Sequence, residues 1–536
     1  MKRHFCIYYI LILGIVCQIS APAAVRYVDN SLTNSANNGI SWANAWTNFQ
    51  SVSGVSGGDT IYISGGSTSK VYSYAADFSG TTWNIPSGTI NNPVSVRIGQ
   101  DVGHNGVAIF DATSTNLDSI FTFQSYQLIS GNYNGATNFL FRNISHTASR
   151  DYGHAINGAG AHTTIEYCAV TNAQNGFKVG GSGGLSDVEI RYCSLVSIYG
   201  DHALQANTGN AVLDDIRLHH LYILTDVNNT TNGAGQYIDM GGPDSFQVGS
   251  GCTIHDTITD HRFSSYPNLG QHPDNIQGGG NHMRIYNNTF YSPPGAVFSN
   301  LPDDRLYDWV IWNNQFINAN TNFNVTRVFE SGYVSVVNVI SNFYWLNNTI
   351  VDFPIGISQV WQQIINPAQY PYTNQPIVTN YVVQNNIFYN TGGEMVIGFG
   401  SYRNSKFSKE NILFSSNLTT PGSKGATRAG FATSAPLSYI NPSYAYWYQS
   451  VSLTNAPTWV SHTSYARNSD LHLAATDSAA TTRGTNLTSL FSSLGIPTAD
   501  KDGVLRPTTG SWDIGAYQNK KAISPPVNLR VSPPKN

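Results

Sequence analysis

A short pattern recurs along the chain as Ile285-Tyr286-Asn287-Asn288, Ile311-Trp312-Asn313-Asn314, Trp345-Leu346-Asn347-Asn348 and Val383-Gln384-Asn385-Asn386. Each copy ends an apolar or aromatic alternation with a polar pair, and less regular copies lie at 139–143, 165–168, 190–193, 216–220, 254–256 and 414–417. The step from Asn143 to Cys168, and again to Cys193, is 25 residues, and later steps run from 26 to 38. A period of this length, with strand-like alternation and no helical stretch, predicts one coil of a β-solenoid.

Stacking of the coils explains the polar pair. Neighbouring strands lie ~4.8 Å apart, so equivalent residues of successive coils lie directly above one another. Cys168 and Cys193 fall on the equivalent step, and an in-register parallel pair suits disulfide geometry poorly, so we expect stacked free thiols. Four asparagines are predicted to form an amide ladder at a bend, each both donating and accepting: Asn288, Asn314, Asn348 and Asn386.

The composition agrees with an all-β chain. Only 11% of the 536 residues are charged, whereas 41% are apolar and 12% aromatic, and the polar remainder is rich in Asn, Ser, Thr and Gly. Such residues favour strands and turns over helices. A net charge of −4 gives no general field for nucleic acid or an anionic membrane surface, so neither is expected as a partner. We expect one long body over residues 25–520, because each coil needs its neighbours to bury its apolar row. We also expect the protein to be a monomer.

The two ends of the chain differ from this body. Residues 1–24 read as a secretory signal peptide, with Lys2 and Arg3, an apolar stretch over 5–16 and small residues at 21–24. We expect export to the medium or the cell surface and no membrane insertion after cleavage. An uncleaved anchor is the alternative, although the apolar run is short for a full span. Residues 521–536 are proline-rich and read as a tail or linker.

A second row of strands is aligned on inward apolar residues. The anchors are Ile156, Phe177, Leu204, Ile238, Ile276, Phe298 and Phe329. The residue after each anchor points outward, because side chains alternate along a strand. This predicts a polar stripe along one face, made of Asn157, Lys178, Gln205, Asp239, Gln277, Ser299 and Glu330. Lys178 and Asp239 would lie two coils apart, ~10 Å by strand spacing.

The residue two before each anchor also merits attention, since a bend in the backbone would turn it toward the same face. This set contains His154, His202 and Asp274. The densest polar patch is Gln271-His272-Pro273-Asp274-Asn275-Ile276-Gln277, which has arginines on either side in sequence, at Arg262 and Arg284. A binding or catalytic site is therefore predicted around this strand.

Two segments at the ends of the body resemble a known family. Residues 26–65, from Arg26-Tyr27-Val28-Asp29 to Gly58-Asp59-Thr60-Ile61-Tyr62-Ile63, look like the N-terminal cap and first strand of the pectate-lyase-like superfamily. Asp502-Gly503, Arg506-Pro507 and Asp513-Ile514-Gly515-Ala516-Tyr517 resemble the closing segment of bacterial members. The resemblance covers roughly residues 25–520 and implies a secreted, right-handed parallel β-helix of about ten or more coils with an N-terminal cap.

The patch at 272–277 resembles the H-x-D-x-I-Q strand of polysaccharide-active members. The resemblance implies a lyase that cleaves uronic-acid glycans by β-elimination, in which a base removes the proton next to the carboxylate. Lys178 is the first candidate base, with His272 and Asp274 as further catalytic candidates. Asp239 and Asp274 would supply oxygen ligands to calcium, and Arg262 or Arg284 would hold the substrate carboxylate. Gln205, Gln277 and His202 complete the predicted substrate-binding set.

Two other functions remain open at this point. A glycoside hydrolase needs two carboxyl groups ~5 to 9.5 Å apart, a spacing that Asp239 and Asp274 on successive coils would allow. A non-catalytic glycan-binding or adhesin-like surface protein would use polar stripes and some of the 31 tyrosines for stacking against sugars. Fold alone does not choose between an enzyme and a binding protein.

Overall fold

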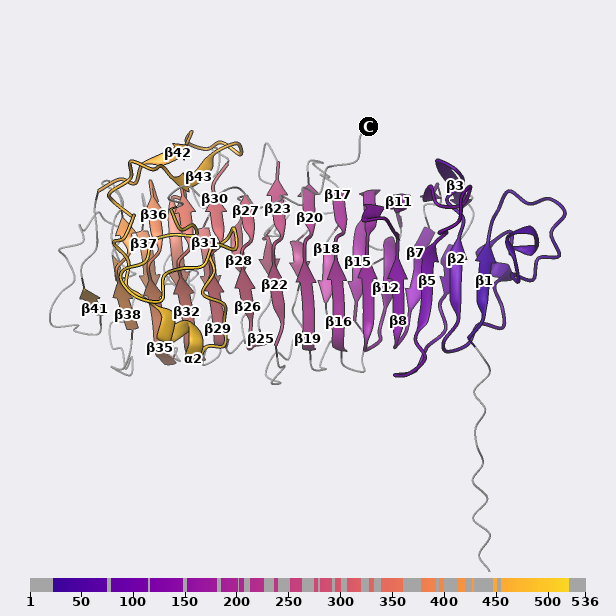
Figure 1. Cartoon of the computed structure of the whole chain (residues 1–536), viewed down its shortest axis with the longest axis horizontal. Helices are drawn as coiled ribbons and strands as arrows, with labels where there is room; N and C mark the ends of the chain where they lie inside the picture. The colour runs from indigo at the N-terminus through magenta and orange to yellow at the C-terminus, as the bar shows by residue number, and fades with distance from the viewer. Residues whose placement is uncertain are drawn as a thin grey trace, which may run out of the picture.

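The computed structural model describes residues 23–74, 79–113, 116–147, 152–180, 185–200, 202–206, 213–225, 236–239, 251–262, 274–277, 280–291, 295–299, 306–319, 327–331, 339–359, 377–391, 395–399, 412–419, 427–428, 447–450 and 455–519. Within these ranges the chain winds through three long parallel sheets in turn, forming an elongated column (Figure 1). This is the predicted right-handed parallel β-helix. Residues 1–22 of the predicted signal peptide and the whole tail lie outside the described residues.

Sheet A contains the repeated pattern from which the fold was predicted. Its inward row runs in register through Ile165, Ile190, Leu218, Ile254 and Ile285, all 0% exposed. Its fifteen strands are β1 (Val25–Val28), β2 (Thr60–Ile63), β5 (Val94–Ile98), β8 (Gln127–Ser130), β13 (Thr163–Glu166), β16 (Leu185–Arg191), β19 (Leu213–His219), β22 (Thr253–His255), β25 (Gly280–Asn281), β26 (Arg284–Tyr286), β29 (Leu306–Trp312), β32 (Val339–Leu346), β35 (Ile377–Gln384), β38 (Ile412–Ser415) and β41 (Trp447–Ser450).

Sheet B corrects one alignment made from the sequence. The pattern at 139–143 pairs with Cys168–Thr171 of sheet B, whereas the sheet A partner of Ile165 is Ile129. The sheet A strand and the sheet B strand of one coil have the same alternation of apolar and polar residues. A strand of one sheet is therefore easily mistaken for a strand of the other in the sequence. The twelve strands are β3 (Ser69–Tyr74), β6 (Val107–Ala112), β11 (Phe139–Ile144), β14 (Cys168–Ala173), β17 (Ser194–Ile198), β20 (Tyr222–Thr225), β23 (Ile258–His261), β27 (Thr289–Tyr291), β30 (Gln315–Ile317), β33 (Thr349–Val351), β36 (Ile387–Tyr389) and β39 (Leu418–Thr419).

Sheet C confirms the alignment of the second row of strands. All seven predicted anchors pair in register from Ile156 to Phe329. The twelve strands are β4 (Ser79–Asn84), β7 (Asn116–Phe123), β12 (His154–Gly158), β15 (Asn175–Val179), β18 (His202–Ala206), β21 (Gln236–Asp239), β24 (Ile276–Gln277), β28 (Ala296–Ser299), β31 (Arg327–Ser331), β34 (Ile355–Gln359), β37 (Met395–Phe399) and β40 (Thr427–Arg428).

The corner between sheets A and B explains the polar pair. The first residue of each pair has a left-handed backbone, with φ of 56° at Asn287, 54° at Asn313 and 53° at Asn347. Asparagine tolerates this conformation better than most residues, and it lets the chain turn sharply into sheet B. The second residue is fully buried and forms the predicted ladder: the Nδ2 of Asn314, for example, donates to the Oδ1 of Asn348 at 3.0 Å.

The thiol prediction is confirmed at the same corner. Cys168 and Cys193 take the ladder position in earlier coils and are buried, free thiols, as is Cys252. Burial raises the pKa of Cys168 well above its usual value, and the neighbouring Cys193 raises it further. Both thiols therefore act as small apolar side chains in the column.

Segments outside the sheets pack on the first coils and along the side of the last coils. Near the N-terminus, the 3-10 helices η1 (Trp42–Asn44) and η2 (Phe49–Ser51) cover the first coils, and Phe49 packs on Tyr72, Trp83 and Phe121. The C-terminal segment, with β42 (Trp459–Ser461), β43 (Asp470–Leu473) and α2 (Thr488–Ser493), lies along the outside of the last coils (Figure 1). The small hairpin β9 (Asn132–Tyr133) and β10 (Ala136–Thr137) is the remaining element. Among the described helices, none has the length and apolar character needed to cross a membrane.

The C-terminal segment packs on the side of the column and buries apolar residues against sheet A. Phe491 and Trp512 lie in one cluster with Val310, Trp312 and Leu346 of strands β29 and β32. Polar contacts add to this packing. The buried Arg506 donates from Nη2 to the Oδ1 of the corner residue Asn313 at 3.1 Å, and Asp513 accepts the backbone N of Thr482. The residues that resemble a family closing segment therefore have structural contacts here.

Candidate functional site

The predicted polar stripe exists as one register-aligned row on the outside of sheet C. Asn157, Lys178, Gln205, Asp239 and Gln277 pair in succession, and the row continues downstream through Ser299 and Glu330. Where the side chains are described they are partly exposed, as at Asn157, Lys178 and Gln205. Lys178 and Asp239 are two coils apart, as predicted. Residues separated by more than sixty positions in sequence thus share one face.

Upstream, the stripe begins with Asn84 and Thr122. Their backbones pair, and the Thr122 hydroxyl donates to the Oδ1 of Asn84. Asn84 also borders a pocket of about 270 Å³ between η2 and β4, whose lining includes Gln50 and Trp83. The row of polar residues therefore extends over at least seven coils, and its N-terminal end lies beside this pocket.

Lys178 differs from the other lysines that the structure describes. Lys70 forms an ion pair with Asp29, and Lys501 donates to the backbone oxygen of Asn287. Lys178, the third, has no hydrogen bond or ion pair within the described part of the chain. A partly exposed amine without a protein partner is available to a ligand that lies along the stripe.

Two of the other predicted residues on sheet C do not point along the stripe. Asp274 is fully buried, and its Oδ1 accepts the backbone N of Ala296 at 2.8 Å. His154 is 1% exposed, so the bend expected two residues before each anchor does not bring it to the surface. His202 is partly exposed at the start of β18, and its backbone N donates to the Oδ1 of Asn175 at 3.0 Å.

The two predicted calcium ligands, Asp239 and Asp274, have different backbone settings. Asp239 lies at an outward register position of β21, whereas the carboxyl of Asp274 is enclosed beside the core. Calcium ligation by Asp239 and Asp274 therefore stays a prediction. His272 and the side chains of Asp239 and Gln277 lie outside the described residues, so their predicted roles stay predictions.

The two predicted arginines lie away from the stripe. Arg262 follows β23 of sheet B, where its Nε donates to the Oδ2 of Asp260 at 2.8 Å. Arg284 belongs to β26 of sheet A, and its Nη2 donates to the Oδ2 of Asp308 at 2.9 Å. Both arginines are near Asp274 in sequence, but the chain bends between them, so that Arg262 lies by sheet B and Arg284 lies on sheet A.

An ionic network on the outside of sheet A was not foreseen from the sequence. Arg191 contacts Glu166 at 2.7 Å and Glu189 at 3.1 Å, and Glu189 accepts from the Nε2 of His219 at 2.9 Å. One coil further on, Arg217 bridges Asp187 and Asp215. In a chain with 11% charged residues this is a dense cluster.

Three histidines lie at the end of this network, at the corner between sheets A and B. His219 and His255 end β19 and β22 and pair in register, and His220 is the corner residue that follows β19. Burial lowers the pKa of both His219 and His220. The signal in the sequence was their place in equivalent copies of the repeat, at 216–220 and 254–256.

Comparisons with known proteins assign no family. No protein-family model and no curated protein matches the sequence. Similar solved structures include an alginate lyase from Paenibacillus (14% identity, 62% of this chain and 94% of that chain, TM-score 0.38). Others are the pectate lyase Pel9A (13%, 93% and 97%, 0.37) and a GH87 α-1,3-glucanase from Streptomyces thermodiastaticus (12%, 76% and 66%, 0.44). At such values the fold rests on the strand pairing of this chain itself.

Proposed function

We propose that the outer face of sheet C binds a polysaccharide and that Lys178 is the base of a β-elimination. The observation that carries this proposal is Lys178 itself, a lysine with no hydrogen bond or ion pair to any described residue, on a register-aligned polar row. The row combines hydroxyl, amide and amine groups with carboxyl residues at Asp239 and Glu330, a mixture of donors and acceptors that suits the hydroxyl groups of a sugar polymer. Its successive positions repeat every ~4.8 Å, so an extended ligand can make equivalent contacts along several coils.

The proposed reaction uses the amine in its neutral form. The Nζ of Lys178 takes the proton from the carbon next to a uronate carboxylate, the electron pair forms a carbon–carbon double bond, and the glycosidic C–O bond breaks. The leaving sugar oxygen then takes a proton, so that one chain gains an unsaturated end and the other a hydroxyl. Gln205 is the next polar group along the row and would donate to the bound sugar.

The test is turnover of a panel of polyuronates, measured by ultraviolet absorbance of the unsaturated ends, with and without calcium. Lys178→Met should lower kcat by roughly 10²- to 10⁴-fold, the usual contribution of a positioned base. Thr171→Val changes a partly exposed side chain on sheet B of the same coil and should leave turnover unchanged. Full activity in Lys178→Met would refute the assignment of the base.

The same assay separates the alternatives. New reducing ends without the absorbance would indicate a hydrolase, to which the burial of Asp274 gives no support. Binding of the polymers without turnover would leave a glycan-binding surface protein. Export of the chain and its release or attachment at the cell surface belong to this proposal, because a polysaccharide of that kind is met outside the cell.

A further inference from the structure

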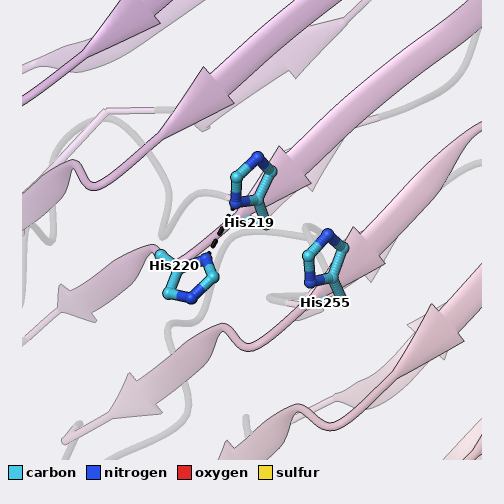
Figure 2. Close-up of side chains that lie close together, drawn as sticks. All are labelled: His219, His220 and His255. Atoms are coloured by element: carbon cyan, nitrogen blue, oxygen red, sulfur yellow. Dashed lines mark hydrogen bonds between the residues drawn. The ribbon is translucent and has the colours of Figure 1, made fainter. Parts of the chain in front are cut away.

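His219, His220 and His255 bring three imidazole rings together from two successive coils (Figure 2). His219 and His255 stack with ring centroids 4.6 Å apart and planes 6° apart. The left-handed backbone at His220, with φ of 53°, turns its ring back toward that of His219. One nitrogen of each ring lies within 4.8 Å of one nitrogen of each of the others.

The hydrogen bond to Glu189 fixes the tautomer of His219. The Nε2 of His219 lies 2.9 Å from the Oε1 of Glu189, so this nitrogen carries the proton and Nδ1 has the lone pair. That Nδ1 lies 2.8 Å from the Nδ1 of His220. A carboxylate that holds the far nitrogen of an imidazole is the usual second partner of a metal-ligating histidine.

We propose that His219, His220 and His255 bind one borderline divalent transition-metal ion, such as Zn²⁺, that joins two successive coils. Imidazole nitrogens suit zinc, copper and nickel, whereas calcium and magnesium prefer oxygen. Zinc–nitrogen bonds of about 2.0–2.1 Å place neighbouring ligands roughly 2.9–3.4 Å apart, depending on the bond angle. The contact between His219 and His220 is already close to that separation, and one nitrogen of His255 lies within 4.8 Å of both.

Asp256 supplies a fourth group beside the three rings. Its Oδ2 lies 2.7 Å from the Nδ1 of His255, and its backbone has the left-handed corner conformation that His220 has one coil earlier. The carboxylate orients His255 and reduces the net charge of the site. Zinc accepts three histidine ligands with a fourth position taken by water.

An aromatic ladder is the competing explanation. His255 also stacks on Tyr286 at 4.6 Å, and Tyr286 stacks on Trp312 at 4.2 Å, so rings at this register position pack well without a metal. A second stack, at the corner residues, contains His220, which lies 4.7 Å from the ring of Tyr192, and Tyr192 in turn stacks on Tyr167 at 4.9 Å. Neither stack requires the Nδ1 of His220 to face the Nδ1 of His219 at 2.8 Å. Titration with a metal ion separates the two explanations, because stacked rings alone do not create a Co²⁺ site.

The full chain, freed of metal with a chelator, is titrated with Co²⁺ and with Zn²⁺. We expect one Co²⁺ per chain with visible absorption bands, displacement by Zn²⁺, and a rise in melting temperature with Zn²⁺. His220→Asn keeps a corner that asparagine occupies in later coils, and His255→Phe keeps a stacking ring. Each variant should weaken Co²⁺ binding at least about tenfold, because loss of even a supporting partner costs that much.

The matched control is His162→Asn. His162 has the same left-handed backbone, with φ of 57°, and pairs with Asp187 on sheet A, yet it belongs to no cluster of three metal-ligating groups among the described residues. It should bind Co²⁺ as the unchanged chain does. The proposal is overturned if the unchanged chain binds no Co²⁺, if His220→Asn binds it equally well, or if His162→Asn loses it to the same extent. None of these results depends on whether the chain acts on a polysaccharide.

Discussion

Asn348→Ala tests whether the buried amide ladder stabilises the column. Asn348 is 0% exposed. Its Nδ2 donates to the backbone oxygen of Ile311 at 2.8 Å and to the Oδ1 of Asn386 at 3.0 Å. Its Oδ1 accepts the backbone N and the Nδ2 of Asn314, at 2.9 and 3.0 Å. One side chain thus satisfies polar groups from the two adjacent coils.

The expected loss follows from the groups left behind. Alanine removes the acceptor of the Asn314 backbone N and the side-chain donor to the Ile311 oxygen, whereas the Nδ2 of Asn314 keeps its bond to Ile285. A buried polar group without its partner costs about 1–3 kcal/mol, so the two backbone groups together cost roughly 2–6 kcal/mol. We expect the free energy of unfolding to fall by about 4 kcal/mol.

The assay is equilibrium urea unfolding followed by tryptophan fluorescence. Asn30→Ala is the control, because Asn30 is exposed and makes one hydrogen bond, to the backbone oxygen of Val71; it should cost less than about 1 kcal/mol. Asn348→Thr should lie between the two, since Thr257 takes the same ladder position and its Oγ1 bonds His255 and Leu221. Equal losses in Asn348→Ala and Asn30→Ala would refute the reasoning.

Two further predictions follow from burial and charge. Cys168 and Cys193 should stay unmodified by a thiol reagent in the folded chain and react on unfolding, because both are 0% exposed; rapid labelling of the native protein, counted by mass spectrometry, would contradict this. Burial acts to lower the pKa of His472, but its hydrogen bonds to the carboxylates of Asp502 and Asp470 outweigh burial and raise the pKa above 6.5. Its stabilising contribution is therefore present below about pH 6.5 and is lost as pH rises through the folded-state pKa. The difference in urea midpoint between the unchanged chain and His472→Gln should shrink over that rise; a constant difference would argue against the pairing.

The strand order of the column could be predicted because it depends on local features repeated many times. The alternation of apolar and polar residues determined which side chains face inward, and the interval between copies determined the length of a coil. The row from Ile156 to Phe329 and the ladder through Asn314 and Asn348 were therefore predicted correctly. The single error, at 139–143, arose because strands of sheets A and B have the same alternation. Periodicity identifies a strand but does not say to which sheet it belongs.

The candidate site was less predictable, because it depends on which way each corner of the coil turns. Lys178 reached the predicted face because it follows a strand anchor directly. Asp274 lies beside a corner and turned inward, and Arg262 and Arg284 passed to other sheets although they are close to it in sequence. Nearness along the chain is a poor guide in a fold whose coil crosses three faces.

The sequence by itself determined that this chain is a column of stacked β coils with a buried amide ladder and a polar row on one side. That much follows from a strand period of two and a coil repeat, which depend on nothing beyond the neighbouring residues. The tertiary structure alone decided that His219, His220 and His255 meet, because their meeting requires a left-handed corner at His220 and the stacking of β19 on β22. The repeat puts His219 and His255 at equivalent positions, but the direction in which the corner turns the ring of His220 is set by backbone conformation in the folded chain.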